Sequence, residues 1–477
     1  MMKKLTIYQP GGSYPDPHLW IEPRSLLSIR FAVFEGLVRY DDNLNIVPLL
    51  AESWTVSDDA KQWIFTLRDG VRYHDGSSVT AADAAASIRN ASRKDVPGAY
   101  GTDALLYAYL GNAAVQALDD RRVRIDLPEP IADLPELLVY IMIIPERCIG
   151  AAPETIPGTG PFRYGKIEGN CYTFFRNDSY WKGTPELEEL VFVDEKDTQK
   201  RVRALINGDA DLITYMTGSQ MTEIDGHDEL CAAEYDTPVS IPLFLNCFSG
   251  PFADVRVRQA VNYGTDVNEI IEKAAEGAAI PLTGPLSHLH FGVNPHAKPY
   301  PYDTKKAWDL LAEAGYENGL ELTMYRPTIS PNESAAVAKC IKQQWARIGI
   351  KVHEVVQEDR EQYALDVRDK KIHDFCIFDS SPVSTYRVLH EKLDSSYSGP
   401  WWQGFNSPEF NELMKKAAET VDTAERKLLY RQAIQIAADE AAWVFLYSPV
   451  QFYGVRWDVI DQYPGICQRA DGVILVR

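Results

Sequence analysis

The sequence predicts an α/β protein of at least two lobes, and three observations lead to this prediction. The chain has 477 residues, whereas a single hydrophobic core stops growing at roughly 250–300 residues. Hydrophobic residues make up 45% of the chain and charged residues 24%, as in ordinary globular proteins. Predicted strands and helices alternate through the later part of the chain, which is typical of an α/β fold.

The first 80 residues have the pattern of short strands and turns. Residues 61–68 (KQWIFTLR) alternate as a strand does, and Asp69-Gly70 directly after them predicts a hairpin turn. Thr80 and Asp83 have the spacing of a capping box, so an alanine-rich helix is expected to follow.

The middle of the chain contains further helices and one apolar strand around Leu212. Asp303 is expected to cap a helix that ends before Gly315, because glycine suits the left-handed position after a helix. Other helices are expected over residues 198–206, 254–263, 267–275 and 424–441.

A βαβ unit is expected in the later part of the chain. Its strands would be residues 321–325 and 350–356, with a helix over residues 333–348 between them. Such a unit implies parallel strands and a right-handed crossover. Ser407-Pro408 predicts the start of another helix, with serine as the N-cap and proline in the first turn.

Charge and hydropathy exclude several classes of protein. The 48 Lys and Arg against 68 Asp and Glu give a net charge of −20, which disfavours binding to nucleic acid or to anionic lipid. The longest dense apolar run, residues 137–144, is far shorter than the ~20 residues that cross a bilayer. The seven cysteines contain no CxxC pair, so we expect no disulfide framework. The N-terminus lacks the apolar stretch of a signal peptide, so either this segment was removed or the protein is cytoplasmic.

Motifs of catalysis are absent from the sequence. It contains no GxSxG, P-loop or HExxH pattern, and Gly158-Thr159-Gly160 lacks the third glycine of a dinucleotide fingerprint. His288, His290 and His296 lie close enough in sequence to bind a transition metal if their loop folds back. A solvated loop is the favoured alternative, because no cysteine or paired carboxylate joins them. We therefore expect no enzymatic activity, no cofactor and no metal.

A series of motifs between about residues 14 and 456 indicates a known family. The motifs are YPDPHL (14–19), VFEGLVRYD (33–41), PLLAESW (48–54), WIFTLRDGV (63–71), GTGPF (158–162), RVRQAVNY (256–263), LLAEAGY (310–316) and SPEF (407–410). In their content and order they resemble the extracytoplasmic solute-binding protein family 5, which comprises the dipeptide-, oligopeptide- and nickel-binding proteins of ABC transporters.

This resemblance implies a periplasmic-binding-protein type II-like fold, in which two lobes close on a ligand about a hinge. The first lobe would comprise residues 1–240, with an extra subdomain at about 41–160. The second lobe would comprise residues 241–452. Residues 453–477 would return to the first lobe.

The resemblance also suggests ligand contacts in the first lobe. Trp20 follows the Pro-Asp-Pro-His start, where the family places side chains in the cleft. A half-buried core aromatic is the alternative for Trp20. Tyr100 lies in an irregular Pro-Gly stretch that is also a contact region of the family.

In the second lobe the resemblance indicates a cleft strand at residues 374–378, followed by Asp379 and Ser380. Family members usually carry tryptophan where this chain has Phe378, and a DYPDP-like segment whose acidic residue meets the amino terminus of a peptide. This chain lacks the Asp-Pro dipeptide, and Asp379 is the candidate for the acidic anchor. The alternative is that Asp379 caps the next helix.

Three further residues follow in the same lobe. Arg387 has the chemistry to bind a carboxylate bidentately, and Trp401 and Trp402 could wall a pocket. The alternatives are a surface ion pair for Arg387 and packing at lobe closure for the tryptophans. The nickel-binding branch typically has an arginine near residues 136–144. This chain has none there, which weakens the hypothesis that its ligand is a nickel chelate.

The sequence thus predicts a substrate-binding protein of an ABC importer, which captures a short peptide or a peptide-like small molecule. The alternative ligands are a nickel or other metal chelate, an opine and an oligosaccharide. Its partners would be the ligand and the permease subunits, and we expect a monomer that works outside the cytoplasm. A cytoplasmic ligand sensor with the same fold is the alternative from another functional class.

Overall fold

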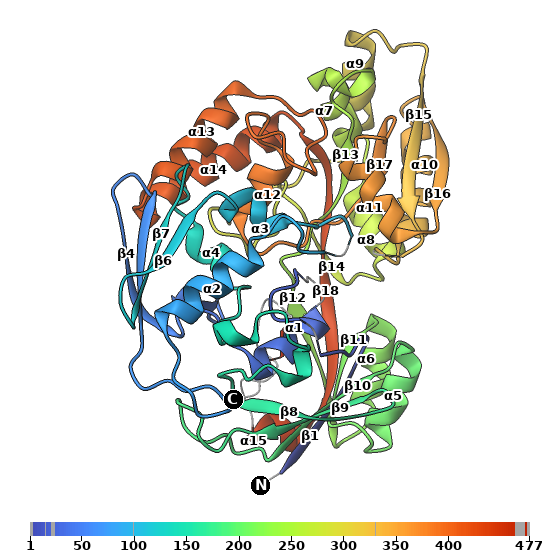
Figure 1. The fold of residues 1–477 in the computed structure, drawn as a ribbon. Coiled ribbons are helices and arrows are strands. Elements are labelled where there is room, and N and C mark those ends of the chain that lie inside the picture. The colour runs from blue at the N-terminus through green and yellow to red at the C-terminus, as the bar shows by residue number, and fades with distance from the viewer. Residues whose placement is uncertain are drawn as a thin grey trace. The chain divides into compact units, whose positions relative to one another are not determined.

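The computed structural model describes residues 3–14, 16–20, 24–98, 100–329, 331–462 and 473–474. The chain divides into two compact units (Figure 1). Unit 1 comprises Met1–Tyr235 and Gln451–Arg477, and unit 2 comprises Asp236–Val450. The predicted lobe boundaries and hinge stay predictions, and part of the expected return segment, residues 463–472 and 475–477, lies outside the described residues.

The main sheet of unit 1 is built around β1 (Lys4–Gln9), whose two neighbours are parallel to it. These neighbours are β10 (Glu189–Asp194) and β11 (Leu212–Met216), and β9 (Cys171–Arg176) and β8 (Phe162–Glu168) extend the sheet beyond β10 in antiparallel order. The core beneath it contains the buried side chains of Leu5, Ile7, Phe162, Phe174 and Phe192.

A separate antiparallel sheet of unit 1 has the order β4-β5-β7-β6, with bounds Ala51–Val56, Gln62–Leu67, Arg122–Asp126 and Ala114–Ala117. Helix α2 (Ala81–Ala91) lies against β6 and β7 (Figure 1). The predicted capping box is confirmed: the Thr80 hydroxyl accepts from the backbone N–H of Asp83, and the Asp83 carboxylate accepts from the backbone N–H of Thr80.

The hairpin predicted at Asp69-Gly70 is wrong. The chain does turn there, with Gly70 at φ +77°, but the segment that follows does not pair with β5. Strand β5 pairs with β4, which precedes it, and with β7, which lies more than fifty residues further along the chain. The dipeptide signals the turn but not the partner of the strand before it.

Unit 1 also contains shorter strands and helices around these sheets. They are α1 (Arg24–Val33), β2 (Val38–Tyr40), β3 (Ile46–Pro48), α3 (Leu105–Leu110), α4 (Leu134–Leu138), η1 (Glu146–Cys148), η2 (Pro153–Thr155), α5 (Thr198–Ile206), α6 (Gly218–Asp225), β12 (Leu230–Asp236, which ends at the first residue of unit 2) and α15 (Trp457–Gln462). The predicted helix over 198–206 and the strand around Leu212 are confirmed.

Unit 2 contains a mixed sheet in the order β16-β15-β17-β13-β18, whose last strand (Trp443–Arg456) continues into unit 1. The other strands are β16 (Ile350–Gln357), β15 (Leu320–Pro327), β17 (Phe375–Ile377), β13 (Ile241–Leu245) and β14 (Ala279–Pro281), which pairs with β18. Strands β15 and β16 are parallel and are connected through α10 (Ser334–Ala346), as predicted (Figure 1). Trp345 of α10 is fully buried against Phe375 of β17.

The helices of unit 2 begin mostly where the sequence places a capping aspartate. They are α7 (Val255–Tyr263), α8 (Val267–Ala274), α9 (Thr304–Glu313), α11 (Arg360–Arg368), α12 (Thr385–Lys392), α13 (Pro408–Glu419) and α14 (Thr423–Asp439), with a short turn η3 (Pro251–Ala253) before α7. Asp303 caps α9, and Gly315 after that helix has φ +90°, as predicted. Ser407 holds the N-cap position of α13, but its hydroxyl donates to Glu440 and accepts no hydrogen bond from the N–H groups of the helix.

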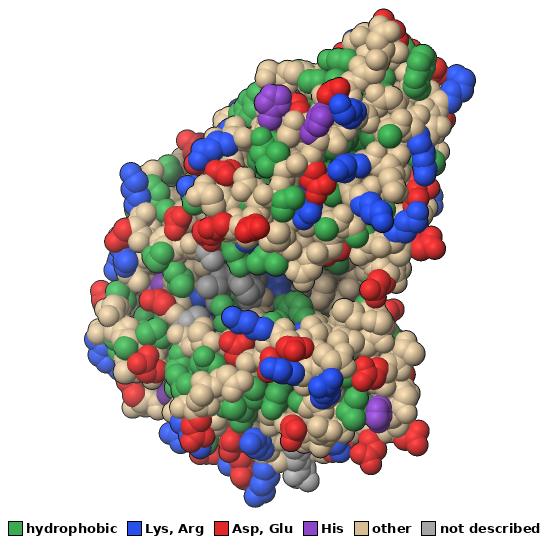
Figure 2. Space-filling model, turned by 90° about the vertical axis from the view of Figure 1, so that its right-hand side faces the viewer, with side chains coloured by type: hydrophobic (Ala, Val, Ile, Leu, Met, Phe, Trp, Pro, Cys, Tyr) green, Lys and Arg blue, Asp and Glu red, His purple; other side chains and the backbone are tan. Residues whose placement is uncertain are grey.

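On the face shown in Figure 2, acidic and basic side chains lie side by side rather than in one continuous patch of a single sign. Within the described residues, we find no helix that is both long and apolar enough to pass through a bilayer.

Candidate functional site

Four of the residues singled out in the sequence lie together in unit 2, just beyond β17. The ring of Phe378 is buried and packs against Phe244, Trp401 and Tyr363, with ring centres 5.3, 5.6 and 5.9 Å away. The guanidinium carbon of Arg360 lies 4.9 Å from the centre of the same ring, in cation–π range. We call Phe378, Asp379, Ser380 and Trp401, together with Arg360, the β17 cluster.

Asp379 is the acidic member of the β17 cluster. Its Oδ1 accepts a hydrogen bond from Nη2 of Arg360 at 2.7 Å. The side chain of Arg360 is 6% exposed and that of Asp379 is 25% exposed. Asp379 does not cap the next helix, because Ser384 holds that position and its hydroxyl accepts from the backbone N–H of Arg387. The alternative of a capping role is therefore wrong.

Ser380 connects the cluster to the backbone before β13. Its N–H donates to the carbonyl of Ser240 and its carbonyl accepts from Ser240, at 2.8 and 2.9 Å. Its hydroxyl accepts from the buried amine of Lys392 at 3.0 Å. The buried hydroxyl of Ser240 makes no hydrogen bond with the described residues, and such an unmet hydroxyl is costly when it is shielded from water.

Arg387 lies on α12 and is buried with Glu391 one turn further along. Its Nε donates to Oε1 of Glu391 at 2.8 Å, and the two side chains are 4% and 2% exposed. The alternative of a surface ion pair is wrong, because the pair lies in the interior. A buried pair of this kind holds its geometry, because removing one partner leaves the other charge desolvated.

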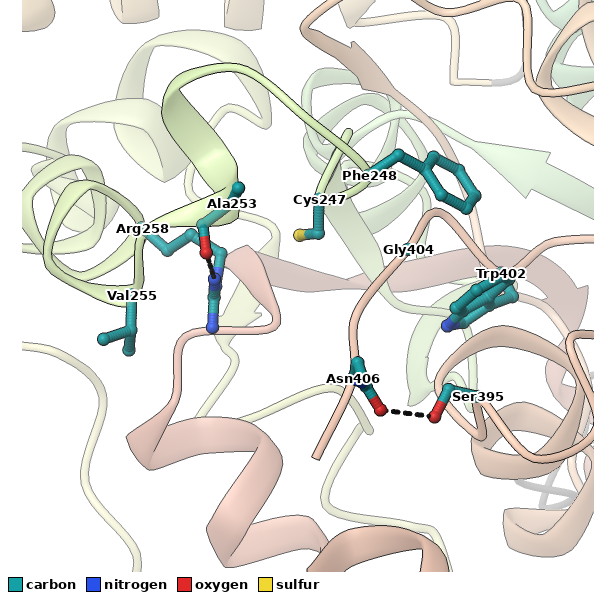
Figure 3. A pocket seen from close by; sticks show the side chains of 9 residues that line it. All are labelled: Cys247, Phe248, Ala253, Val255, Arg258, Ser395, Trp402, Gly404 and Asn406. Atoms are coloured by element: carbon teal, nitrogen blue, oxygen red, sulfur yellow. Dashed lines mark hydrogen bonds between the residues drawn. The ribbon is translucent and has the colours of Figure 1, made fainter. Parts of the chain in front are cut away.

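Trp401 and Trp402 are adjacent in sequence but lie in different surroundings. Trp401 packs on Phe378 in the β17 cluster. Trp402 donates from Nε1 to the carbonyl of Phe405 at 2.6 Å, and its ring meets Phe248 edge to face. Trp402 therefore lines a separate pocket of unit 2 (Figure 3).

Lys370 positions the segment before these tryptophans, and sequence reasoning did not identify it. Its amine donates to the carbonyls of Gly399 and Pro400 at 3.2 and 2.7 Å. Burial lowers the pKa of Lys370 to about 8. No local pattern would have revealed this role, because the partners are about thirty residues away along the chain.

The two candidates of the first lobe lie in unit 1. Trp20 is 4% exposed, and its ring meets that of Tyr140 at 5.2 Å between centres. A backbone bridge joins Trp20 to Gly98, two residues before Tyr100. Tyr100 is 39% exposed and has a positive φ of 54°. Trp20 is thus a largely buried aromatic, whereas Tyr100 presents its ring to solvent.

The three histidines do not form a metal centre. His288 contacts the carboxylate of Asp236 at 3.0 Å, His290 is buried with Nε2 2.9 Å from the carbonyl of Pro382, and His296 is exposed. Burial lowers the pKa of His290 to about 4, which keeps it neutral. Across the described ranges no group of three or more His, Cys, Asp or Glu side chains is arranged to hold a metal ion.

Comparison with known proteins identifies the family. The model of the bacterial extracellular solute-binding proteins, family 5, matches residues 45–403. The chain belongs to this family. The family resemblance predicted from the motifs is therefore confirmed, and this family member is a solute-binding protein and not an enzyme.

Two curated relatives align over most of their length. The glutathione-binding protein GsiB of Pectobacterium atrosepticum is 28% identical, with 87% of this chain and 82% of the relative covered. The heme-binding protein A of Haemophilus influenzae is 29% identical, with 92% of this chain and 85% of the relative covered. The two relatives have different ligands in their names, so family membership alone does not fix the ligand.

Solved structures confirm the type II periplasmic-binding-protein fold. The DppA protein of Helicobacter pylori in complex with the peptide STSA has a TM-score of 0.77 at 24% identity, with 99% of this chain and 98% of that chain covered. The AgaA protein of A. tumefaciens R10 in complex with agropinic acid has a TM-score of 0.78 at 27% identity, with 98% and 97% covered. The family member described here therefore has the predicted α/β fold over nearly its whole length.

Proposed function

We propose that this solute-binding protein is the substrate-binding component of an ABC importer and that it captures a short peptide or a peptide-like small molecule. In this role it works as a monomer outside the cytoplasmic membrane and delivers its ligand to the permease subunits. The similarity to GsiB over 82% of that protein supports a peptide-like ligand, because glutathione is itself a tripeptide.

The peptide assignment rests on the hydrogen bonding of the two carboxylate oxygens of Asp379. One of its carboxylate oxygens accepts from Arg360, while Oδ2 makes no hydrogen bond or ion pair with the described residues. A partly exposed carboxylate oxygen of this kind is a good acceptor for an ammonium group. In the proposed complex Asp379 accepts from the amino terminus of the peptide.

The other members of the β17 cluster complete the proposed contacts. Trp401 and Phe378 pack on each other next to the carboxylate and are largely buried, so their rings form the apolar support of the contact with Asp379. Backbone groups and bridging waters would hold the main chain of the peptide. In unit 1 we assign a contact to Tyr100, whose ring is exposed.

A small molecule rich in carboxylates, such as an opine, is the second candidate ligand. The observation that favours it is the guanidinium of Arg360, which lies beside the ring of Phe378 and next to the Asp379 carboxylate. A bidentate arginine recognises carboxylates well. The agropinic acid in the AgaA complex is a ligand of this kind of chemistry.

The test is a thermal-shift screen of protein that has been unfolded and refolded to remove bound ligand. The screen contains pooled di- to pentapeptides, glutathione, agropinic acid, hemin and a nickel–histidine chelate as separate arms. A ligand at 100 times its Kd stabilises the fold by about 2.7 kcal/mol, which raises the midpoint by a few degrees for a protein of this size. A shift with peptides or glutathione only is the expected result, and a shift with another arm only would reject the peptide assignment.

Variants of Asp379 test the contact itself. Asp379→Asn should weaken peptide binding at least tenfold, because the amide loses the charge that attracts the amino terminus. Asp309→Asn is the matched control, since Asp309 forms only an exposed pair with Lys305 one turn away on α9. Blocking the peptide with an N-acetyl group should reproduce the loss in the wild-type protein. Equal affinity of Asp379→Asn and wild type would refute the role of this carboxylate.

A further inference from the structure

The pocket that contains Trp402 is a second feature of unit 2, distinct from the β17 cluster. It has a volume of about 660 Å³, which lies within the range of small-molecule sites. Phe248 and Trp402 form one wall, and η3 with the first turn of α7 forms the other (Figure 3). The function proposed above makes no use of this pocket.

Arg258 of α7 is the only charged side chain among the residues that line the pocket. The residue is 6% exposed. Its Nε donates to the carbonyl of Glu440, and its Nη1 donates to the carbonyls of Phe252 and Ala253. All three acceptors are neutral, and no carboxylate of the described residues lies within ion-pair distance of this guanidinium.

The acidic groups nearest to Arg258 in sequence and contact are already engaged. Asp254 accepts from Nε and Nη2 of Arg256. The side chain of Glu440 accepts from the hydroxyl of Ser407 at 2.8 Å. A buried cation usually has an anionic partner, because burial of an unpaired charge is expensive. Arg258 is therefore a buried positive charge without an anionic partner among the described residues, and an anionic ligand would supply one.

Two donor groups are available to such an anion. Nη2 of Arg258 makes no hydrogen bond with the described part of the chain, and the guanidinium extends from α7 into the pocket in Figure 3. The amide oxygen of Asn406 accepts from Ser395 at 2.8 Å, whereas its amide nitrogen has no acceptor within the described residues. Both residues line the pocket together with the rings of Phe248 and Trp402, and the rest of its lining is formed by Cys247, Ala253, Val255, Ser395 and Gly404.

We propose that this pocket binds a small aromatic carboxylate, with the carboxylate on Arg258 and Asn406 and the ring against Phe248 and Trp402. A guanidinium and an amide N–H together satisfy a carboxylate, since each of its oxygens accepts more than one hydrogen bond. Phe248 is 46% exposed, and a bound ring covers this apolar surface. The site is separate from the one proposed for the transported ligand.

The test uses phenylacetate as the probe and its neutral isostere phenylacetamide as the control, in isothermal titration calorimetry with the full chain. Phenylacetate should bind with a one-to-one stoichiometry and at least tenfold more tightly than phenylacetamide. No binding of phenylacetate up to about 10 mM, or equal affinity of the two probes, would overturn the proposal.

Variants at Val255 locate the probe without disturbing the core. Val255 is 37% exposed at the first position of α7, where an added carboxylate favours the helix. Val255→Asp should lower the affinity for phenylacetate about tenfold, because the new carboxylate repels the carboxylate of the probe at short range. Val255→Asn has nearly the same shape without the charge and should bind as wild type does. Equal affinities of these two variants would refute the assignment.

Two more variants complete the design. Phe248→Ala removes the exposed ring and should lower the affinity for phenylacetate severalfold. Its thermal unfolding midpoint should stay near that of wild type. Asp379→Asn should leave phenylacetate binding unchanged, because the β17 cluster does not line this pocket. If Asp379→Asn abolishes phenylacetate binding, the probe occupies the β17 cluster and the proposal of a second site fails.

Discussion

Acidification should destabilise the protein through His290, a buried imidazole of unit 2. Its Nε2 lies 2.9 Å from the carbonyl of Pro382, and its Nδ1 lies 3.3 Å from the hydroxyl of Ser287. Burial lowers the pKa of His290 to about 4, and the hydrogen bond with Pro382 opposes this shift only in part. The folded protein therefore resists protonation at a pH where the unfolded chain accepts the proton.

The direction and the size of the stability change follow from the pKa of His290 in the folded protein and in the unfolded chain. The imidazole has a pKa of about 6.5 in the unfolded chain. Stability is thus complete above about pH 6.5 and falls as the pH drops toward 4, because the unfolded state binds more protons in this window. The full difference of about 2.5 pKa units corresponds to about 3.4 kcal/mol. At pH 5 the loss is about 2 kcal/mol.

The assay is urea unfolding of wild type and His290→Gln at pH 7.0 and pH 5.0. Glutamine keeps a donor for the Pro382 carbonyl but does not titrate. Other groups, including the buried His18 with its pKa lowered to about 4 by burial, are common to both proteins and cancel in the comparison. Wild type should lose about 2 kcal/mol more than the variant on acidification. Equal losses in the two proteins would refute the reasoning.

Three further substitutions test other parts of the structure. Thr80→Ala should cost about 1 kcal/mol in chemical denaturation, because the N–H of Asp83 loses its cap, and a change near zero would contradict the capping box. Arg387→Met should cost about 3–5 kcal/mol by leaving Glu391 buried without this partner, whereas the double variant with Glu391→Leu should recover most of that stability; a double variant as unstable as the single one would argue against the pair. Gly404→Ala should cost more than about 1 kcal/mol, since Gly404 has φ +90° and an added Cβ would lie 2.5 Å from the backbone nitrogen of Phe248, and an unchanged thermal midpoint would show that this loop relaxes freely.

Local chemistry made many elements predictable from the sequence. Asp303 caps α9 and Gly315 takes the left-handed position after it, because both preferences depend only on neighbouring backbone groups. The helix over 198–206 was also predicted, and the parallel pair of the βαβ unit was predicted from the order strand, helix, strand along the chain. The candidate site residues were predicted only from the family resemblance, since no catalytic or metal-binding pattern marks them.

Contacts between side chains that lie far apart in the sequence could not be predicted. The family resemblance singled out Asp379 as a candidate contact but did not identify Arg360, which contacts it from α11, because nothing in the local pattern joins residues that far apart. It also grouped Trp401 with Trp402, whereas the turn of the backbone directs one ring to Phe378 and the other to Phe248. The sequence determines which side chains are available, and the tertiary fold determines which of them meet.

Strand β18 has a consequence for how the chain acquires its structure during synthesis. Residues 443–456 follow β11 and β13 far along the chain, yet the first part of the strand pairs with β13 and the last part pairs with β11. Neither sheet can be completed until the ribosome has made the chain through Arg456. A nascent or truncated chain that ends before Trp443 therefore exposes the open edges of β13 and β11 at once, and such edges invite aggregation.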